Sequence, residues 1–163
     1  MVTIRRCTRT DETAVIDLIN SIMSKEFHEV KHAYPTEDVE CIEKAYGGIG
    51  EAFFVAVSQD KVVGTVAIKK EDERVALLRR LFVAPSHRNQ KIGKKLIDHA
   101  LQFCKETGYE ELVFKTTSKM SGAVELCKKN GFVQRAKISL GPIELLKFSL
   151  PLRDIVSVGK GAA

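Results

Sequence analysis

Residues 75–107 constrain the fold most, because an apolar run, a basic turn and an amphipathic segment follow one another directly. The apolar run of residues 75–83 has the composition of a strand, and it stops at Ala84-Pro85 because proline cannot donate to a strand ladder. Beyond the turn, the apolar positions share one helical face. They are Ile92, Leu96, Ile97, Ala100, Leu101 and Cys104. Gly108 is typical of a helix C-cap. The segment predicts a strand, a loop and a long helix.

The rest of the chain supplies elements of both kinds, recognised by apolar periodicity and by the turn residues between them. We expect strands at 2–5, 52–57, 62–68, 112–114, from 132 and at 143–150, and helices from Asp11, from residues 35–36 to the glycines at 47–50, and around 123–127. This order predicts an α/β (α+β) fold with a mixed, mostly antiparallel sheet of about seven strands and helices on both faces. We expect one domain over 1–150 and a C-terminal tail over 151–163.

Composition narrows the class of protein. The 163 residues are 44% hydrophobic, which is enough for a core and argues against disorder. A formal net charge of +5 favours anionic partners without selecting one. No apolar run reaches the roughly 18 residues of a membrane helix, and charges at residues 5–6 interrupt any signal peptide, so we expect a cytoplasmic protein. The dispersed cysteines form no zinc-finger pattern, and a reducing compartment fits them.

The loop at 84–91 has the features of an anion site. A helix N-terminus offers free backbone N–H groups and a partial positive charge, and a pyrophosphate suits both. Arg88, Lys91, Lys94 and Lys95 add full charges around the same turn. Neither a P-loop nor a dinucleotide-binding glycine motif is present. From the local pattern alone, an ordinary solvated basic helix start is an equally good interpretation.

Two spaced motifs make this segment resemble the GNAT superfamily of acetyl-CoA-dependent N-acetyltransferases. That family's cofactor loop usually reads R-G-Q-G-I-G, and residues 88–93 read R-N-Q-K-I-G after a V-A-P at 83–85. The family's A-x-x-L-Y-x-x-x-G-F is similar to residues 123–132, which read A-V-E-L-C-K-K-N-G-F. Two motifs about 30 residues apart are far more specific than either alone.

The resemblance implies an acyltransferase that uses acetyl-CoA as acyl donor, no metal, and a primary amine as acceptor. The pantetheine arm would follow the strand, where a backbone N–H would stabilise the oxyanion, and the pyrophosphate would lie on the following loop. The implied binding residues are Leu81, Phe82 and Val83 on the strand, and Arg88, Asn89, Gln90, Lys91, Ile92, Gly93 and Lys94 on the loop and helix. The resemblance is compatible with a monomer or a homodimer.

Two departures from the family pattern carry predictions. Lys91 stands where the family has glycine, and we expect its φ to stay negative, so that its N–H and ammonium both serve the phosphate. A positive φ there would instead lower the affinity for the cofactor. Cys127 stands where many members have a tyrosine that protonates the departing CoA thiolate. This cysteine is either a replacement general acid or a buried, packed side chain.

The acceptor side is less readable. By resemblance, Glu26, His28, His32 and Tyr34 would form part of its wall, and Thr116 and Thr117 would orient the amine. An ordinary solvated surface and a helix cap are the alternative interpretations. The general base is not identified, because the strand at 75–83 contains no carboxylate.

Two other functions remain open. A CoA-binding regulator without catalysis fits the changes at Lys91 and Cys127. Binding to nucleic acid through the basic surface is weaker, because tryptophan is absent and aromatic residues make up only 7%. We therefore expect no nucleic-acid partner and no membrane partner.

Overall fold

A computed structural model describes residues 1–152, apart from the side chains of residues 32 and 33. The strands are β1 (Val2–Arg6), β2 (Ala52–Ser58), β3 (Lys61–Lys70), β4 (Val75–Val83), β5 (Glu111–Thr117), β6 (Val133–Leu140) and β7 (Ile143–Pro151). The helices are α1 (Glu12–Glu26), α2 (Glu37–Glu40), α3 (Ile42–Tyr46), α4 (Ile92–Thr107) and α5 (Ser121–Lys129). Short 3-10 turns are η1 (Arg9–Asp11), η2 (His28–Ala33) and η3 (Pro85–His87).

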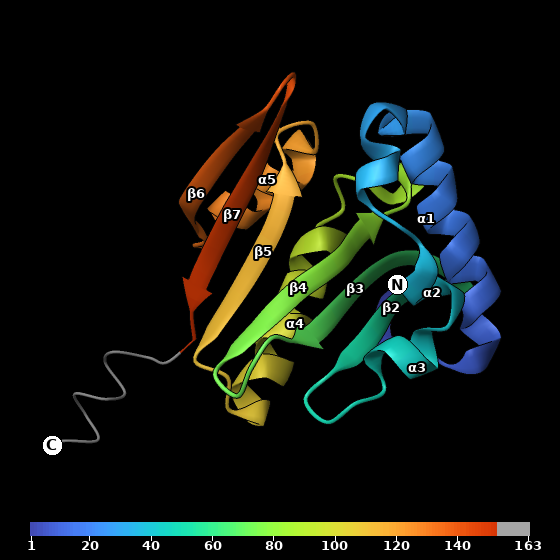
Figure 1. The fold of residues 1–163 in the computed structure, drawn as a ribbon. Helices are drawn as coiled ribbons and strands as arrows, with labels where there is room; N and C mark the ends of the chain where they lie inside the picture. The colour runs from blue at the N-terminus through green and yellow to red at the C-terminus, as the bar shows by residue number, and fades with distance from the viewer. Residues whose placement is uncertain (153–163) are drawn as a thin grey trace, which may run out of the picture.

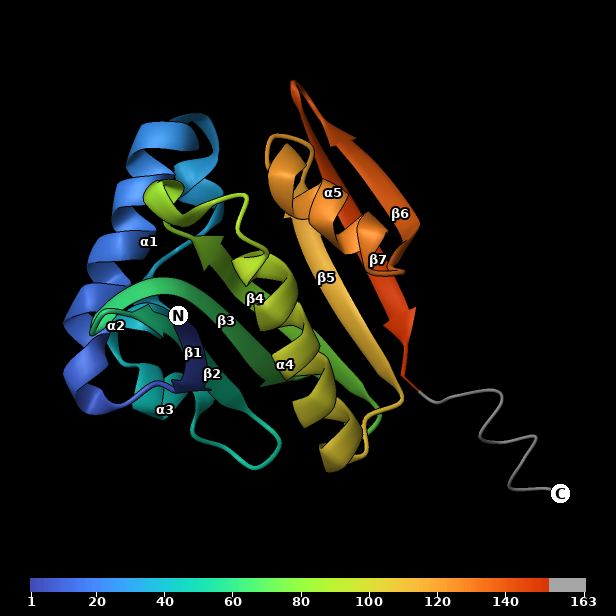
Figure 2. The ribbon, with the colours of Figure 1, turned by 180° about the vertical axis from the view of Figure 1, so that it is seen from behind.

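The seven strands form one mixed sheet in the order β1-β2-β3-β4-β5-β7-β6. Every neighbouring pair is antiparallel except β4 and β5, which are parallel and joined by α4. Helices α1, α2 and α3 cover one face, and α4 and α5 cover the other (Figures 1 and 2). The predicted fold class is confirmed.

Two local predictions change in detail. The helix expected after Pro35 is interrupted at Cys41, whose φ of −147° and ψ of 75° separate α2 from α3. The helix expected from Asp11 begins at Glu12, and the Asp11 carboxylate makes no capping bond to it. It accepts two bonds from the Arg5 guanidinium, at 2.7 and 3.1 Å, and one from the Thr8 N–H at 2.8 Å. The carboxylate therefore fixes the end of β1 to the start of α1.

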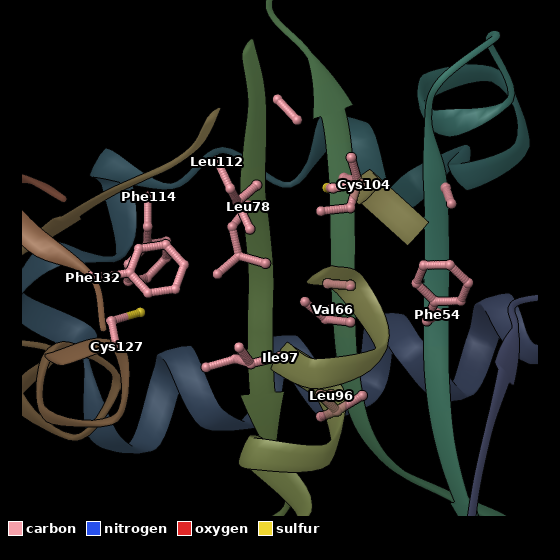
Figure 3. Close-up of a cluster of buried hydrophobic side chains, with 14 of the residues drawn as sticks. Phe54, Val66, Leu78, Leu96, Ile97, Cys104, Leu112, Phe114, Cys127 and Phe132 are labelled. Atoms are coloured by element: carbon pink, nitrogen blue, oxygen red, sulfur yellow. The ribbon is translucent and has the colours of Figure 1, made fainter. Parts of the chain in front are cut away.

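The apolar face of α4 packs on the sheet and defines the larger core cluster (Figure 3). Leu96, Ile97, Ala100 and Cys104 have no exposed surface, as the predicted helix face requires. Gly108 ends the helix in the left-handed region, with φ of +100°. The position of α4 is therefore fixed by burial along its length and by a glycine at its end.

The expected tail begins with two residues that belong to the folded part. Pro151 closes β7, and Leu152 is buried in the core cluster with its N–H bonded to the Glu110 carbonyl at 2.8 Å. Residues 153–163 lie outside the described part of the chain.

Candidate active site

The sheet opens between its two parallel strands. β4 and β5 pair from Val75 and Glu111 up to Leu78 and Phe114, and no register between them continues beyond that point. β4 runs on to Val83 beside β3, and β5 runs on to Thr117 beside β7. The two strands visibly diverge toward these ends (Figure 1). Backbone groups along the inner edges of the opening therefore have no partner strand across it, and they can bond an extended ligand.

The first turn of α4 lies after the end of β4 that borders this opening. Lys91 is the N-cap residue and makes no side-chain capping bond, so the first N–H groups of α4 are not satisfied by a cap. Lys91 and Lys95 form no ion pair with any described residue, and Lys94 pairs only with Asp98, at 2.9 Å on the surface. The structure therefore leaves backbone donors and lysine charges available at this turn, where the sequence predicts an anion site.

The backbone of Lys91 contradicts the expectation of a negative φ. Its φ is +64° and its ψ is 19°, so the position has the left-handed conformation that glycine adopts most readily. The family's glycine is explained by that geometry. Lysine holds the same turn at a cost of about 1–2 kcal/mol in backbone strain. By the argument made from the sequence, this conformation predicts a lower affinity for the cofactor than glycine would give.

Replacing this lysine tests the strain directly. Lys91→Gly is expected to raise the free energy of unfolding by about 0.5–1 kcal/mol, because the strain relieved exceeds the extra entropy of the unfolded chain. Asn89→Gly is the matched control, since Asn89 also has a positive φ, of 63°, but asparagine tolerates it well. Chemical denaturation of the ligand-free proteins measures both. A less stable Lys91→Gly protein would show that the strain at this turn is smaller than the entropy that glycine adds to the unfolded chain.

Arg88 is already paired with a residue of the predicted acceptor wall. Its guanidinium donates to both carboxylate oxygens of Glu26, at 2.6 and 2.9 Å, and its Nε donates to the Val83 carbonyl at 3.1 Å. The structure thereby brings together one predicted cofactor residue and one predicted acceptor residue. Arg88 fastens the loop to the ends of α1 and β4, and the lysines are the cations left for a phosphate.

Several predicted binding residues can contact a ligand only through their backbone. Ile92 is 1% exposed in the core beneath α4, and Phe82 is buried among the residues that α1 covers. Gly93 has a separate reason to be glycine. A Cβ there would lie 2.7 Å from Leu126 Cδ2. The missing side chain lets α5 approach the first turn of α4, and α5 thus borders the predicted phosphate site.

The predicted acceptor residues gather near the same opening. The Tyr34 hydroxyl lies 3.5 Å from Thr116 Oγ1, at the long limit of a hydrogen bond, although 82 positions separate them in the chain. His28 and Tyr34 line a hollow of about 430 Å³ together with Lys31, Pro35 and Thr36. Thr117 is 1% exposed, and its Oγ1 has no hydrogen-bond partner among the described residues. His32 lies outside the described side chains.

Cys127 is packed in the core. It has no exposed surface and lies in one cluster with Phe114 and Phe132 (Figure 3). Burial raises the pKa of the Cys127 thiol to about 12. Transfer of its proton to a CoA thiolate, with an ordinary pKa of about 8.5, is uphill by roughly 5 kcal/mol. Of the two roles open from the sequence, the structure favours packing.

Sequence reasoning missed two residues that lie next to this site. Arg80 on β4 and Asp38 on α2 form a buried ion pair, with side chains 5% and 13% exposed. Residues so far apart cannot be paired from the sequence, but the Arg79-Arg80 doublet within a predicted strand indicates a buried arginine or a bulge. In a regular strand one member of such a doublet must point inward, which requires either a buried partner or a bulge.

A mixed sheet that opens between its parallel strands, beside an uncapped basic helix start, defines an α/β domain suited to an extended ligand that carries an anionic group. The family model described as the acetyltransferase (GNAT) family matches residues 16–132, and the chain belongs to that family. Human N-acetyltransferase 8B is 39% identical over 101 residues, which are 58% of this chain and 44% of that protein. The probable N-acetyltransferase camello of Xenopus tropicalis is 31% identical over 72% of this chain and 54% of its own. The chain spans about half the length of these curated relatives.

Solved structures agree on the fold. A GNAT-family acetyltransferase from Staphylococcus aureus superposes with a TM-score of 0.83 and 26% identity, over 94% of this chain and 100% of that one. A putative acetyltransferase from Salmonella typhimurium, solved with its cofactor acetyl-CoA, superposes with a TM-score of 0.78 over 94% and 95% of the two chains. Its 18% identity makes it evidence for the fold alone.

Two kinds of feature are absent from the described residues. Among the side chains described for residues 1–31 and 34–152, no three from His, Cys, Asp or Glu lie close enough together to hold a metal ion. Within the same range, none of the helices has both the length and the apolar character needed to cross a bilayer.

Proposed function

We propose that this chain transfers an acetyl group from acetyl-CoA to a primary amine. The observation that carries the proposal is the opening between β4 and β5 beside the uncapped start of α4, in a chain of the acetyltransferase (GNAT) family. The opening supplies unpaired backbone along the path of a pantetheine arm, and the helix start supplies N–H groups and lysines for its pyrophosphate. The Salmonella protein, whose fold is similar, was solved with acetyl-CoA.

The chemistry is a direct transfer within a ternary complex. The amine nitrogen forms a bond to the thioester carbon, the carbonyl oxygen becomes an oxyanion, and a backbone N–H of β4 stabilises it. The C–S bond then breaks, CoA leaves as the thiolate, and the amine loses its proton to water. Because a thiol has a pKa of about 8.5, its thiolate leaves without an acid far more readily than an alkoxide does. The buried Cys127 is therefore not needed in this scheme.

The amine enters from the side of Tyr34 and Thr116. Their hydroxyls face each other at 3.5 Å beside the hollow that His28 and Tyr34 line, which supports an acceptor path at this edge of the opening. Within residues 1–152 all four cysteines are free thiols, which supports the companion proposal of a reducing, cytoplasmic compartment. We therefore propose acetyl-CoA and an amine as the partners of this chain.

The test is a thiol-release screen with acetyl-CoA over amino acids, polyamines, aminoglycosides and peptide N-termini. We expect release that depends on one acceptor class, and a rise in melting temperature with acetyl-CoA but not with RNA or DNA. No binding and no release would overturn the proposal. Binding without release over the whole panel would instead favour a CoA-binding regulator, the second candidate, which the loss of the family's tyrosine to a buried Cys127 supports.

A further inference from the structure

Arg80 has an unusual backbone in the middle of β4. Thr65 of β3 pairs with Phe82 and Ala67 pairs with Arg79, so β4 contains one extra residue in this interval, a β-bulge. Arg80 lies in that bulge with φ of +53°. A non-glycine residue in this region carries about 1–2 kcal/mol of strain, which persists only where the surroundings hold it.

Hydrogen bonds from the side chain of Arg80 hold this strained backbone in place. Its Nε donates to Asp38 Oδ2 at 2.9 Å, and a second guanidinium nitrogen donates to Asp38 Oδ1 and to the Pro35 carbonyl. The Tyr46 hydroxyl donates to the same carboxylate, and Thr65 Oγ1 donates to the Arg80 carbonyl at 2.6 Å. The guanidinium is therefore bonded to Asp38 of α2 and to Pro35, and the backbone of the bulge is bonded to Thr65 of β3.

Asp38 is ionised in this setting. Burial acts to raise its pKa, but hydrogen bonds from Arg80 and Tyr46 and the charges of Arg80 and Arg79 act the other way. The pKa of Asp38 lies below its ordinary value as a result. A buried, bidentate ion pair of this kind is shielded from solvent and fixes the relative orientation of its two side chains.

The location of this network connects the two halves of the proposed reaction. The extra residue in β4 comes just after Leu78, where pairing with β5 ends and the opening begins. Pro35 and Asp38 flank Thr36, which lines the acceptor hollow together with Tyr34. One buried ion pair thus joins the strand that would hold the thioester to the segment that would hold the amine.

We propose that Arg80 and Asp38 are positioning residues, which hold the bulged backbone of β4 and the segment at 34–38 in register for acyl transfer. Neither residue touches the reacting atoms in this scheme. The proposal rests on the proposed acetyltransferase function and adds residues to its machinery. Because a small displacement of an oxyanion donor or a nucleophile lowers the rate steeply, the pair acts on turnover more than on binding.

Asp38→Asn tests the proposal, and Asp11→Asn is its matched control. Asp11 also accepts two bonds from an arginine, and its side chain is similarly buried at 9% exposure, but it lies at the far edge of the sheet, beside β1. Both variants lose a paired carboxylate. We expect Asp38→Asn to lower kcat about tenfold to a hundredfold while KM for acetyl-CoA changes less than about threefold. Asp11→Asn is expected to leave both constants within about twofold.

A comparison of two Arg80 variants shows whether kcat depends on the ion pair with Asp38 or only on the positive φ of residue 80. Glycine adopts a positive φ freely, whereas lysine keeps a charge for Asp38. We expect Arg80→Lys to retain more of kcat than Arg80→Gly, although glycine suits the backbone better. The reverse order would overturn the proposal.

Amide NMR provides a readout that does not depend on turnover. In Asp38→Asn, the amide signals of residues 80–82 are expected to shift, and in Asp11→Asn they are expected to stay. Unmoved signals, or full kcat in Asp38→Asn alongside an active wild type, would overturn the positioning roles and leave the proposed function standing. A wild type that neither binds acetyl-CoA nor releases CoA would remove both proposals together.

Discussion

Replacing Lys94 with aspartate is expected to weaken acetyl-CoA binding about tenfold to a hundredfold while leaving the fold nearly as stable as before. Lys94 lies in the first turn of α4, next to the uncapped N–H groups. An acidic residue near a helix start interacts favourably with the helix dipole, and this offsets both the loss of the exposed pair with Asp98 and the new repulsion between the two carboxylates. The unfolding free energy should therefore change by less than about 0.5 kcal/mol. A diphosphate bound there would nevertheless meet a negative charge in place of a positive one.

Lys105→Asp provides the control for net charge. Lys105 lies in the last turn of the same helix, about 16 Å from Lys94 along the axis, which exceeds the Debye length of about 8 Å at physiological salt. The substitution makes the same charge change at the unfavourable end of the dipole, so it should lower stability and leave affinity unchanged. Calorimetric titration with acetyl-CoA and thermal melts measure the two effects. Equal losses of affinity in both variants would place the diphosphate elsewhere.

Sequence predicted α4 so well because two independent signals coincide there. The apolar positions from Ile92 to Cys104 describe one continuous buried face, and Gly108 supplies the left-handed residue that ends the helix. The helix expected after Pro35 shows the limit of such periodicity. Val39, Ile42 and Tyr46 have helical spacing and are all buried, yet the backbone breaks between them at Cys41. Apolar spacing reports which side chains are buried, and it does not report whether the helix between them is continuous.

Backbone conformation at the site was harder to predict than residue identity. The family's glycine at the position of Lys91 was the signal for a positive φ, and lysine's own preference pointed the wrong way. The position of the loop before α4 was thus predicted from the sequence, but its backbone strain was not. Contacts between residues far apart in the sequence could not be predicted for a different reason. Arg80 and Asp38, or Tyr34 and Thr116, meet only because the sheet topology brings separate elements together.

The same topology makes the stability of β5, which forms one wall of the opening, depend on one buried aromatic residue of β7. Phe148→Ala is expected to lower the free energy of unfolding by about 3–5 kcal/mol, which corresponds to a fall of roughly 10 °C in Tm. Phe148 lies on β7 directly opposite Phe114 of β5, it has no exposed surface, and it belongs to the core cluster under α4. Removing its ring leaves a cavity beside β5 that the parallel pairing with β4 cannot close.

Leu145→Ala is the matched control on the same strand. Leu145 is 36% exposed, so its truncation should cost less than about 1 kcal/mol. Chemical denaturation of both variants gives the comparison. If Phe148→Ala cost no more than Leu145→Ala, β5 and β7 would not belong to the same cooperative unit as β4 and α4. The opening would then lack a rigid second wall, and acetyl-CoA would have to order β5 as it binds. A loss of the expected size instead shows that both walls are preformed, so that binding to them requires little rearrangement of the sheet.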